Sequence, residues 1–192
     1  MSLDRGFIKS IVEGLIFAHS EPITREGIAA VLKTVSEEII QQVLDELEQE
    51  YFHRARGFVL TNVADGYQFR SLPSIAPWIL EMKSIKPSRL SRAALETLSI
   101  IAYNQPITRS RIEKIRGVET AGTIKSLLER DLLVIAGRLE IPGRPLVYGT
   151  SRRFLEVFGL TNLACLPPLP DIELIIDEEN EHQYRNDPRN SK

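Results

Sequence analysis

The residues of this sequence that could do chemistry are few and widely separated. His19, His53 and His182 are scattered, and none has a second ligand type at the short spacing that zinc sites need. Cys165 is the only cysteine and has no evident base beside it to activate its thiol. The sequence also contains neither a phosphate-binding loop nor a dinucleotide-binding fingerprint. We therefore predict no catalytic residue, no metal site and no cofactor.

The remaining chemistry is that of charge, and it is distributed unevenly. Residues 1–84 carry 8 Lys/Arg and 12 Asp/Glu (net −4), and residues 85–170 carry 13 and 7 (net +6). Residues 171–192 carry 3 and 7 (net −4). Because nucleic acid attracts basic surfaces, any contact with DNA would have to use the middle block.

The charges of two segments bear on whether the protein binds DNA. Residues 37–50 read EEIIQQVLDELEQE, with six acids and no Lys or Arg, which is unsuitable for a helix that reads a DNA groove. In the middle block, basic residues crowd one short segment: Arg109, Arg111, Lys114 and Arg116. Three interpretations of this cluster stay open: a solvated basic face, attraction to an acidic protein partner, or weak non-specific DNA contact.

An internal repeat organises the elements that carry these residues. Residues 16–28 (IFAHSEPITREGI) and 100–112 (IIAYNQPITRSRI) are identical at seven of thirteen positions, at a constant offset of 84. This period is too long for one unit of a solenoid, so it predicts a duplicated small domain.

Each copy predicts three helices followed by a β-hairpin. In the first, helices are expected at about 5–19, 25–33 and from Ser36, and strands at about 57–63 and 67–71 around an Asp65-Gly66 turn. Thr24 is the expected N-cap of the second helix. A further helix at 75–84, with Trp78 and Ile79, is expected to close this domain.

The second copy predicts the same order of elements. Ser91 and Thr108 are expected N-caps of its first two helices, with Leu95, Leu98, Ile112 and Ile115 among the inward residues. A third helix follows at about 120–131, a wing at about 132–150 with a turn at 142–143, and a last helix from Ser151 with Phe154, Leu155 and Phe158 inward.

The pattern predicts an α+β, mainly helical fold with two tandem winged-helix domains. The expected bounds are 1–84 for the first domain and 88–165 for the second, with a boundary at 86–88. Residues 166–192 turn Pro-rich and then acidic, which predicts a flexible, disordered tail. No apolar run is long enough to span a membrane, and a single cysteine suits a reducing compartment, so a cytoplasmic location is expected.

Several stretches of the sequence resemble the ScpB family of bacterial chromosome-partition proteins. In the second domain these are LSRAALETLSIIAYNQPITRSRIEKIRGV, GRLEIPGRPLVYGT and FLEVFGL. In the first they are EGLIFAHSEPIT, GYQFRSLPSIAPWI and the Gly57-Phe58 wing start. The resemblance covers about residues 5–165 and not the tail.

This resemblance implies a non-enzymatic adaptor that forms a homodimer, binds the kleisin ScpA and through it joins the SMC complex. Such a subunit supports chromosome condensation and segregation during cell division. The resemblance associates the first domain with self-association and the second with kleisin contact. The alternative from the fold alone is a winged-helix DNA-binding transcriptional regulator.

The apolar residues suggest where partners would bind. The first helix has more apolar positions than one narrow stripe needs, so Phe7, Ile11 and Phe17 are candidates for self-association. Strand alternation leaves part of the apolar wing outward, where a kleisin helix or extended segment would dock. The candidate partner-binding residues are Leu139, Ile141, Leu146 and Tyr148. Core packing is the competing explanation for each of them.

Overall fold

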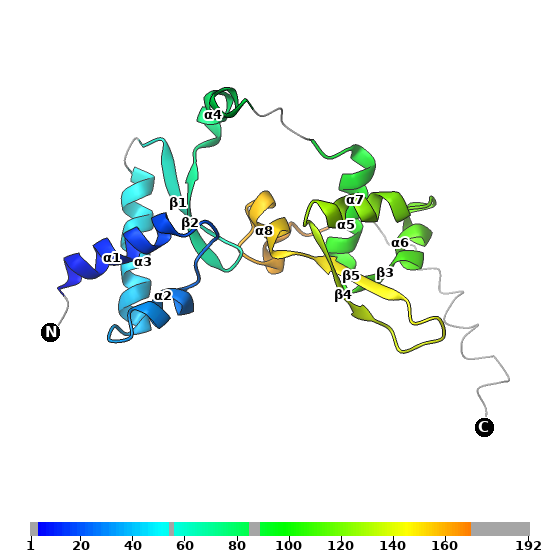
Figure 1. Cartoon of the computed structure of the whole chain (residues 1–192), viewed down its shortest axis with the longest axis horizontal. Coiled ribbons are helices and arrows are strands. Elements are labelled where there is room, and N and C mark those ends of the chain that lie inside the picture. Colours follow the sequence, from blue (N-terminus) through cyan, green and yellow to red (C-terminus); the bar gives the residue numbers. More distant parts are fainter. Residues whose placement is uncertain (1–3, 54–55, 85–88, 170–192) are drawn as a thin grey trace.

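The chain forms two lobes that lie side by side (Figure 1). The computed structural model describes residues 4–53, 56–84 and 89–169. The predicted boundary at 86–88 and the predicted disordered tail beyond residue 169 lie outside the described residues. Each lobe contains its own hydrophobic cluster, and the fold is mixed α+β, mainly helical, with two tandem winged-helix domains.

The first domain consists of three helices and a two-stranded hairpin. The elements are α1 (Arg5–Ala18), α2 (Arg25–Val31), α3 (Glu37–His53), β1 (Phe58–Val63) and β2 (Gly66–Ser71). α1, α2 and α3 pack their apolar faces together, and the hairpin covers α3. The fully buried side chains of this core include Val12, Ile16, Ile28, Ile40, Val43, Leu44 and Leu47.

The second domain repeats this plan and adds a third strand and a fourth helix. Its elements are α5 (Arg92–Asn104), β3 (Ile107–Thr108), α6 (Arg109–Arg116), α7 (Ala121–Glu129), β4 (Leu133–Arg138), β5 (Leu146–Thr150), α8 (Arg152–Phe158) and the short 3-10 helix η2 (Leu163–Cys165). The strand order is β3-β5-β4, so β4 lies at an edge. The fully buried side chains include Leu98, Ile101, Ile112 and Leu127.

The duplicated segments occupy equivalent places in the two domains. The Thr24 hydroxyl accepts the N-cap hydrogen bond of α2, and the Thr108 hydroxyl accepts that of α6. The residue before each threonine pairs with a tyrosine of its own hairpin: Ile23 with Tyr67, and Ile107 with Tyr148. The shared sequence therefore specifies one local structure twice: a short extended segment that joins the wing and then starts a helix.

The hairpin turn of the first domain differs from the prediction by one residue. The two positive-φ residues are Ala64 and Asp65, at 51° and 56°, whereas Gly66 is the first residue of β2. Gly66 is required for another reason: a Cβ there would lie 2.9 Å from the backbone carbonyl carbon and oxygen of Ile23. The glycine thus permits close approach of two backbones rather than a left-handed turn.

Three residues predicted to face the second core are exposed instead. Leu95, Ile115 and Phe158 are 42%, 49% and 43% exposed. Leu95 lies at the margin of the α5 stripe, whose buried members are Ala94, Leu98 and their helical neighbours, while Ile115 and Phe158 lie at the ends of short helices. Short helices with one narrow buried stripe leave such flanking positions in solvent.

The segment after the first hairpin forms the 3-10 helix η1 (Pro73–Ile75) and helix α4 (Ala76–Lys83). The helix itself was predicted, but its role in closing the first domain was not correct. None of its residues is buried, and Trp78 is 67% exposed. Figure 1 shows α4 standing away from the body of the first domain.

The two domains meet through hydrogen bonds between the first hairpin and the segment around α8. The Ala64 amide donates to the Leu160 carbonyl oxygen at 2.9 Å, and the Arg152 guanidinium donates to the Pro22 carbonyl oxygen at 2.6 Å. Further donor–acceptor pairs are Asp65 N to Thr161 O, Arg70 to Glu156 O, and Thr161 Oγ1 to Asn62 O. All five bonds end on a backbone carbonyl oxygen, and three of them are donated by the side chains of Arg70, Arg152 and Thr161.

Candidate protein-binding surfaces

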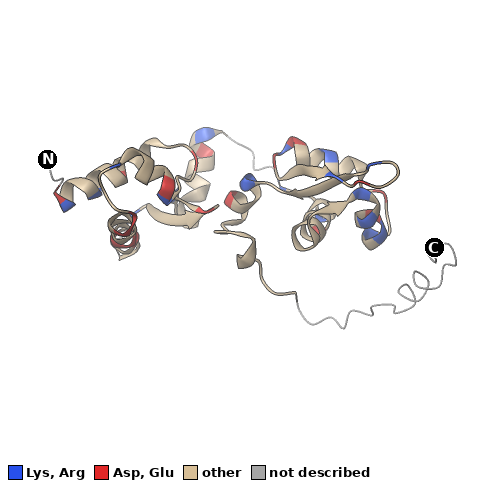
Figure 2. Cartoon of the chain, turned by 90° about the horizontal axis from the view of Figure 1, so that it is seen from below, with Lys and Arg blue, Asp and Glu red and all other residues tan. Residues whose placement is uncertain are grey.

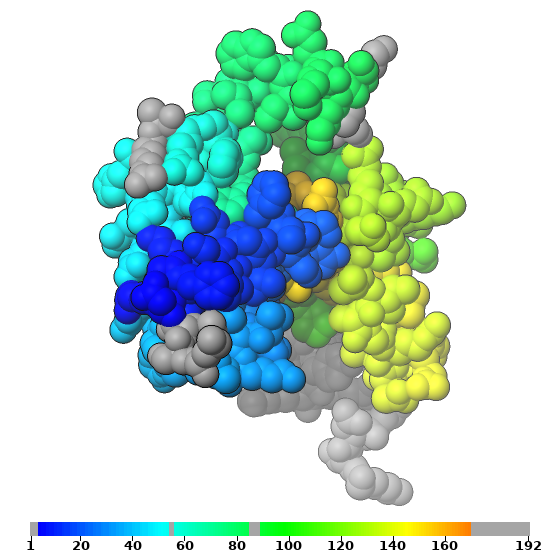
Figure 3. Space-filling view, turned by 60° about the vertical axis from the view of Figure 1, so that its left-hand side comes forward, coloured from blue at the N-terminus to red at the C-terminus, as the bar shows by residue number. Residues whose placement is uncertain are grey.

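The first candidate surface is the outer face of α1. Phe7 and Phe17 are 57% and 80% exposed, although they belong to a helix whose other face is fully buried. At helical spacing between them lie two small exposed residues, Ser10 and Gly14. α1 lies across the face of the molecule shown in Figure 3. Two aromatic rings separated by small residues form a surface onto which another helix can pack closely.

Gly14 is surrounded by open space in the described part of the chain. A Cβ at this position would meet no atom within 4 Å, and the residue sits in the interior of a helix. Glycine in a helix interior costs roughly 0.5–1 kcal/mol relative to alanine. The open space at Gly14 would let the backbone of another helix approach α1 closely.

Replacing Gly14 with alanine should separate folding stability from self-association. We expect the isolated chain to gain about 0.5–1 kcal/mol in free energy of unfolding, because the helix loses its flexible residue. Self-association should weaken, because the added methyl group holds the two surfaces apart. Urea unfolding at low concentration and analytical ultracentrifugation measure the two effects. Gly122→Ala in α7, also in open space, is the control that should leave self-association unchanged.

The other predicted self-association residue, Ile11, is half-buried. It packs against the first core, so only part of its side chain is available to a partner. Phe7 and Phe17 therefore form most of the apolar area of the α1 surface.

The second candidate surface is the edge strand β4. Its outer side pairs with no other strand in the part of the chain that the structure describes. Val134 and Ile135 are 44% and 53% exposed, and Ala136 is exposed as well. An unpaired strand edge with apolar side chains can accept an extended segment of another protein as an additional strand. We had not predicted Val134 and Ile135; two adjacent β-branched residues in the first wing strand were the available signal.

The predicted wing residues divide into two groups. Leu139 and Ile141 are 40% and 52% exposed, near the wing turn. Leu146 is half-buried against the second core, and Tyr148 is buried within it, 8% exposed. Tyr148 is paired with Ile107 and Ile135 in the centre of the sheet, so its predicted contact with a partner is not supported by its position.

The electrostatics of α3 are unfavourable for DNA. Arg5 and Lys9 of α1 neutralise some of its acids: Arg5 lies 2.5 Å from a Glu46 carboxylate oxygen, and Lys9 pairs with Glu46 at 3.8 Å. Further along, burial raises the pKa of Glu48, and the nearby Asp45 carboxylate adds to the rise. Despite these effects, residues 37–50 hold six acids and no Lys or Arg, so this helix remains unfavourable for contact with a phosphate backbone.

Several basic side chains of the second domain form ion pairs with acidic side chains of the same domain. Figure 2 shows Lys and Arg gathered in this lobe, with Asp and Glu interspersed. Ion pairs join Arg109 to Glu113, Lys125 to Glu129, Arg144 to Glu140 and Arg153 to Glu156. Local pairing of this kind lowers the attraction for a phosphate backbone, since the neighbouring carboxylates oppose it.

Within the described residues, no three His, Cys, Asp or Glu side chains are grouped closely enough to hold a metal ion. None of the helices in the described ranges combines the length and apolar character needed to cross a membrane. Cys165 is exposed on η2. The surfaces that stand out in this part of the chain are apolar faces suited to other polypeptides.

Comparison with known proteins identifies the family. The sequence model "Segregation and condensation complex subunit ScpB" matches residues 10–169. Segregation and condensation protein B of Syntrophotalea carbinolica is 46% identical over 176 residues, covering 92% of this chain and 89% of that protein. The Desulforamulus reducens protein of the same name is 43% identical over 169 residues, covering 88% and 93%.

Solved structures give a looser likeness. The crystal structure of ScpB from Mycobacterium tuberculosis shares 29% identity, covers 84% of this chain and all of that chain, and has a TM-score of 0.40. The dimer of an ScpB N-terminal domain complexed with an ScpA peptide shares 33% identity, covers 38% and 91%, and has a TM-score of 0.36. The sequence matches therefore carry the assignment and confirm the resemblance noted above. The chain belongs to the ScpB family, the non-enzymatic subunits of the SMC segregation and condensation complex.

Proposed function

We propose that this chain is a cytoplasmic adaptor that forms a homodimer through the α1 surface and binds the kleisin ScpA through the wing of its second domain. Through ScpA it joins the SMC complex and supports chromosome condensation and segregation. The observation that carries the proposal is the pair of unpartnered apolar surfaces, one in each domain of the described part of the chain.

The α1 surface supports self-association because it can pack against its own copy. In a two-fold dimer the same patch is used twice, so a stripe of aromatic and small residues must complement itself. Phe7 and Phe17 at the two ends of the stripe can flank Gly14 of the partner, where helix backbones approach closely. This arrangement gives the helix-interior glycine a use that the single chain does not supply.

The edge of β4 supports capture of an extended kleisin segment. Main-chain hydrogen bonds to the edge of β4 would supply affinity. The exposed side chains of Val134 and Ile135, which point to opposite faces of the sheet, would supply apolar contact. Leu139 and Ile141 extend the apolar area toward the wing turn. We assign kleisin contact to this wing because it combines an open edge with apolar side chains.

A DNA-binding transcriptional regulator is the alternative function for a winged-helix chain, and the described surfaces do not favour it. The third helix of the first domain is acidic, and the third helix of the second domain carries Lys125 in an ion pair with Glu129. Direct readout needs several free donors on such a helix. Weak, salt-sensitive contact of the second domain with DNA stays a secondary proposal, checked by titrating duplex DNA at two salt concentrations.

The test of the kleisin proposal is binding of the middle segment of ScpA to the full chain. Replacing both Val134 and Ile135 with aspartate should weaken this binding at least about 30-fold, since loss of a central apolar contact costs 2 kcal/mol or more. Isothermal titration calorimetry measures the change. Val118→Asp is the matched control, because Val118 is 55% exposed in the same domain but belongs to the loop between α6 and α7 rather than to the wing.

Unchanged binding by the double variant would reject the wing as the contact. A second arm of the experiment substitutes Phe7 and Phe17 in the first domain, because the solved dimer of an ScpB N-terminal domain is a complex with an ScpA peptide. If only this arm loses ScpA, the kleisin contact belongs to the first domain. If neither arm responds and no ScpA binds, the adaptor proposal fails.

A further inference from the structure

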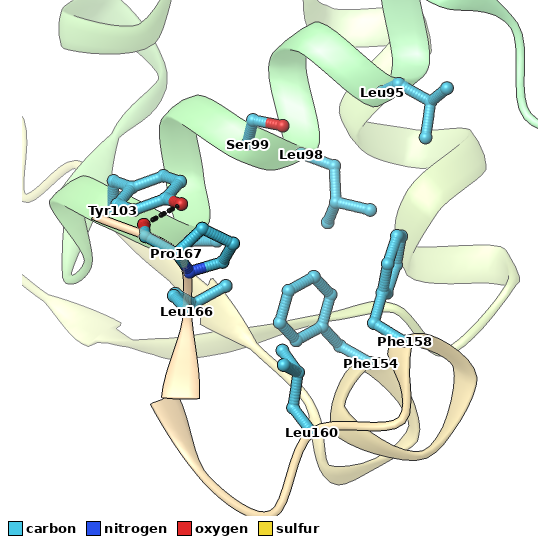
Figure 4. A pocket seen from close by; sticks show the side chains of 10 residues that line it. Leu95, Leu98, Ser99, Tyr103, Phe154, Phe158, Leu160, Leu166 and Pro167 are labelled. Atoms are coloured by element: carbon cyan, nitrogen blue, oxygen red, sulfur yellow. Dashed lines mark hydrogen bonds between the residues drawn. The ribbon is translucent and has the colours of Figure 1, made fainter. Parts of the chain in front are cut away.

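An apolar pocket of about 270 Å³ lies between α5 and α8 in the second domain (Figure 4). Leu166 and Pro167, which follow η2, form one of its walls. The Tyr103 hydroxyl donates a hydrogen bond to the Pro167 carbonyl oxygen at 2.6 Å and holds this wall against α5. The pocket thus belongs to the packing of this segment onto α5. A surface with more specific chemistry is the outer face of α6 in the same domain.

The outer face of α6 carries two basic side chains without an acidic partner. Arg111 and Lys114 are exposed and lie three positions apart, on the solvent side of the helix. Neither of them forms an ion pair among the described residues. Glu113, the acid of this helix, is bound to Arg109 and to the Thr120 amide. The face therefore presents positive charge that its own domain does not compensate.

The first domain presents the complementary charge on α3 at the same spacing. Asp45 and Glu48 are also three positions apart, and neither forms an ion pair in the described part of the chain. The cations of α1 pair with other acids of this helix, Glu46 and Glu50. Burial raises the pKa of Glu48, and the Asp45 carboxylate adds to the rise. A cation brought to this face would therefore be attracted by both carboxylates.

The contact between the domains keeps these two faces apart within one chain. The domains meet through the first hairpin and the segment around α8. Figure 1 shows α3 on the outer side of the first lobe and α6 on the outer side of the second, with the hairpin and α8 between them. In this arrangement the acidic and basic faces can meet only when they belong to two different copies of the chain.

We propose that α3 of one copy binds α6 of a second copy, with Asp45 and Glu48 facing Arg111 and Lys114. Side chains three positions apart on a helix have Cβ atoms roughly 5–6 Å apart, so two helices lying side by side form both ion pairs at once. The contact uses a different surface on each copy, and each pair of copies keeps one free face of either kind. Association can therefore continue head to tail.

This contact is independent of the proposed homodimer and of ScpA. It uses neither the α1 surface nor the edge of β4, so it can link dimers that form through α1. Exposed ion pairs are weak one by one and are screened by salt. The contact should therefore need low ionic strength, and it gains strength when two dimers make it more than once.

A second copy fits the basic face of α6 better than duplex DNA does. Proteins that bind DNA tightly make about 6–10 phosphate contacts, whereas this face offers two cations without an acidic partner among the described residues. The same two cations match the two carboxylates of α3 in number and in spacing.

Sedimentation velocity of the full chain at about 20 mM and about 500 mM NaCl tests the proposal. Association beyond the dimer should be present at low salt and lost at high salt. Reversing either the basic face (Arg111→Glu with Lys114→Glu) or the acidic face (Asp45→Lys with Glu48→Lys) should raise its dissociation constant at least about tenfold. A mixture of the two double variants should restore the association, because each variant then meets opposite charge on the other.

The control is Arg92→Glu with Lys125→Glu, which changes the net charge equally on other parts of the second domain and should leave the association unchanged. Adding Phe17→Asp should leave the contact intact as a link between monomers, which separates it from the α1 dimer. The salt dependence of the unmodified chain needs no variant, so the test does not depend on how the variants fold.

Three results would overturn the proposal. The first is an unmodified chain whose association does not depend on salt. The second is a loss in the control as large as in the face variants, since net charge alone would then explain the effect. The third is a reversal of Arg111 and Lys114 that weakens binding to duplex DNA and leaves self-association unchanged, which assigns the face of α6 to nucleic acid.

Discussion

Replacing Phe17 with aspartate should convert the proposed homodimer into monomers. Phe17 is 80% exposed, and in the proposed dimer its ring is buried against the partner. A central aromatic contact contributes 2 kcal/mol or more, and a buried unpaired carboxylate adds a desolvation penalty. We expect the dimer dissociation constant to rise by at least about a hundredfold, corresponding to roughly 3 kcal/mol. Sedimentation equilibrium over a range of concentrations measures this change.

The fold should not be affected by the Phe17 substitution, because the side chain has little contact with its own domain. A matched control is Phe52→Asp, at the end of α3, where the ring is 77% exposed in the same domain. Phe52 lies outside the α1 surface, so this variant should still dimerise. A dimer that survives Phe17→Asp, or that is lost equally in both variants, would place the self-association surface elsewhere on the molecule.

Replacing Gly66 with alanine should destabilise the first domain by about 2–4 kcal/mol. The new methyl group would lie 2.9 Å from the Ile23 carbonyl and 3.0 Å from the Pro22 carbonyl carbon, all backbone atoms. Relieving this contact separates Ile23 from Tyr67 and breaks their two hydrogen bonds, of 3.0 Å and 2.8 Å. Urea unfolding measures the loss of stability, and amide hydrogen exchange shows in which of the two domains the loss occurs.

The loss should be confined mainly to the first domain, because the second has its own core. The contact between the domains should also loosen, since the Pro22 carbonyl oxygen accepts the hydrogen bond from Arg152. Gly14→Ala is the internal comparison, because it is the same substitution in the same domain but in open space. A stability change of the same sign and size in both variants would contradict the explanation from backbone contact.

The duplicated winged-helix fold could be predicted from the amino-acid sequence alone. This was possible because the signals are local: the period of apolar residues along each helix, the hydroxyls of Thr24 and Thr108 at the helix starts, and the repeated Pro-Ile-Thr-Arg segment. A helix cap acts within three residues, so the amino acids that make it are already adjacent in the chain.

Which apolar residues remain exposed to partners depends on the packing of the whole chain. Strand alternation cannot tell that Tyr148 lies in the central strand while Ile135 lies at an edge, because strand order depends on contacts between distant segments. For the same reason Gly66 was interpreted as a turn residue, although its function comes from Ile23, more than forty residues away. The pocket between α5 and α8 likewise exists only after the end of the second domain folds back onto its first helix. Burial and backbone approach are properties of the packed chain, and they select the binding surfaces from a larger set of apolar positions.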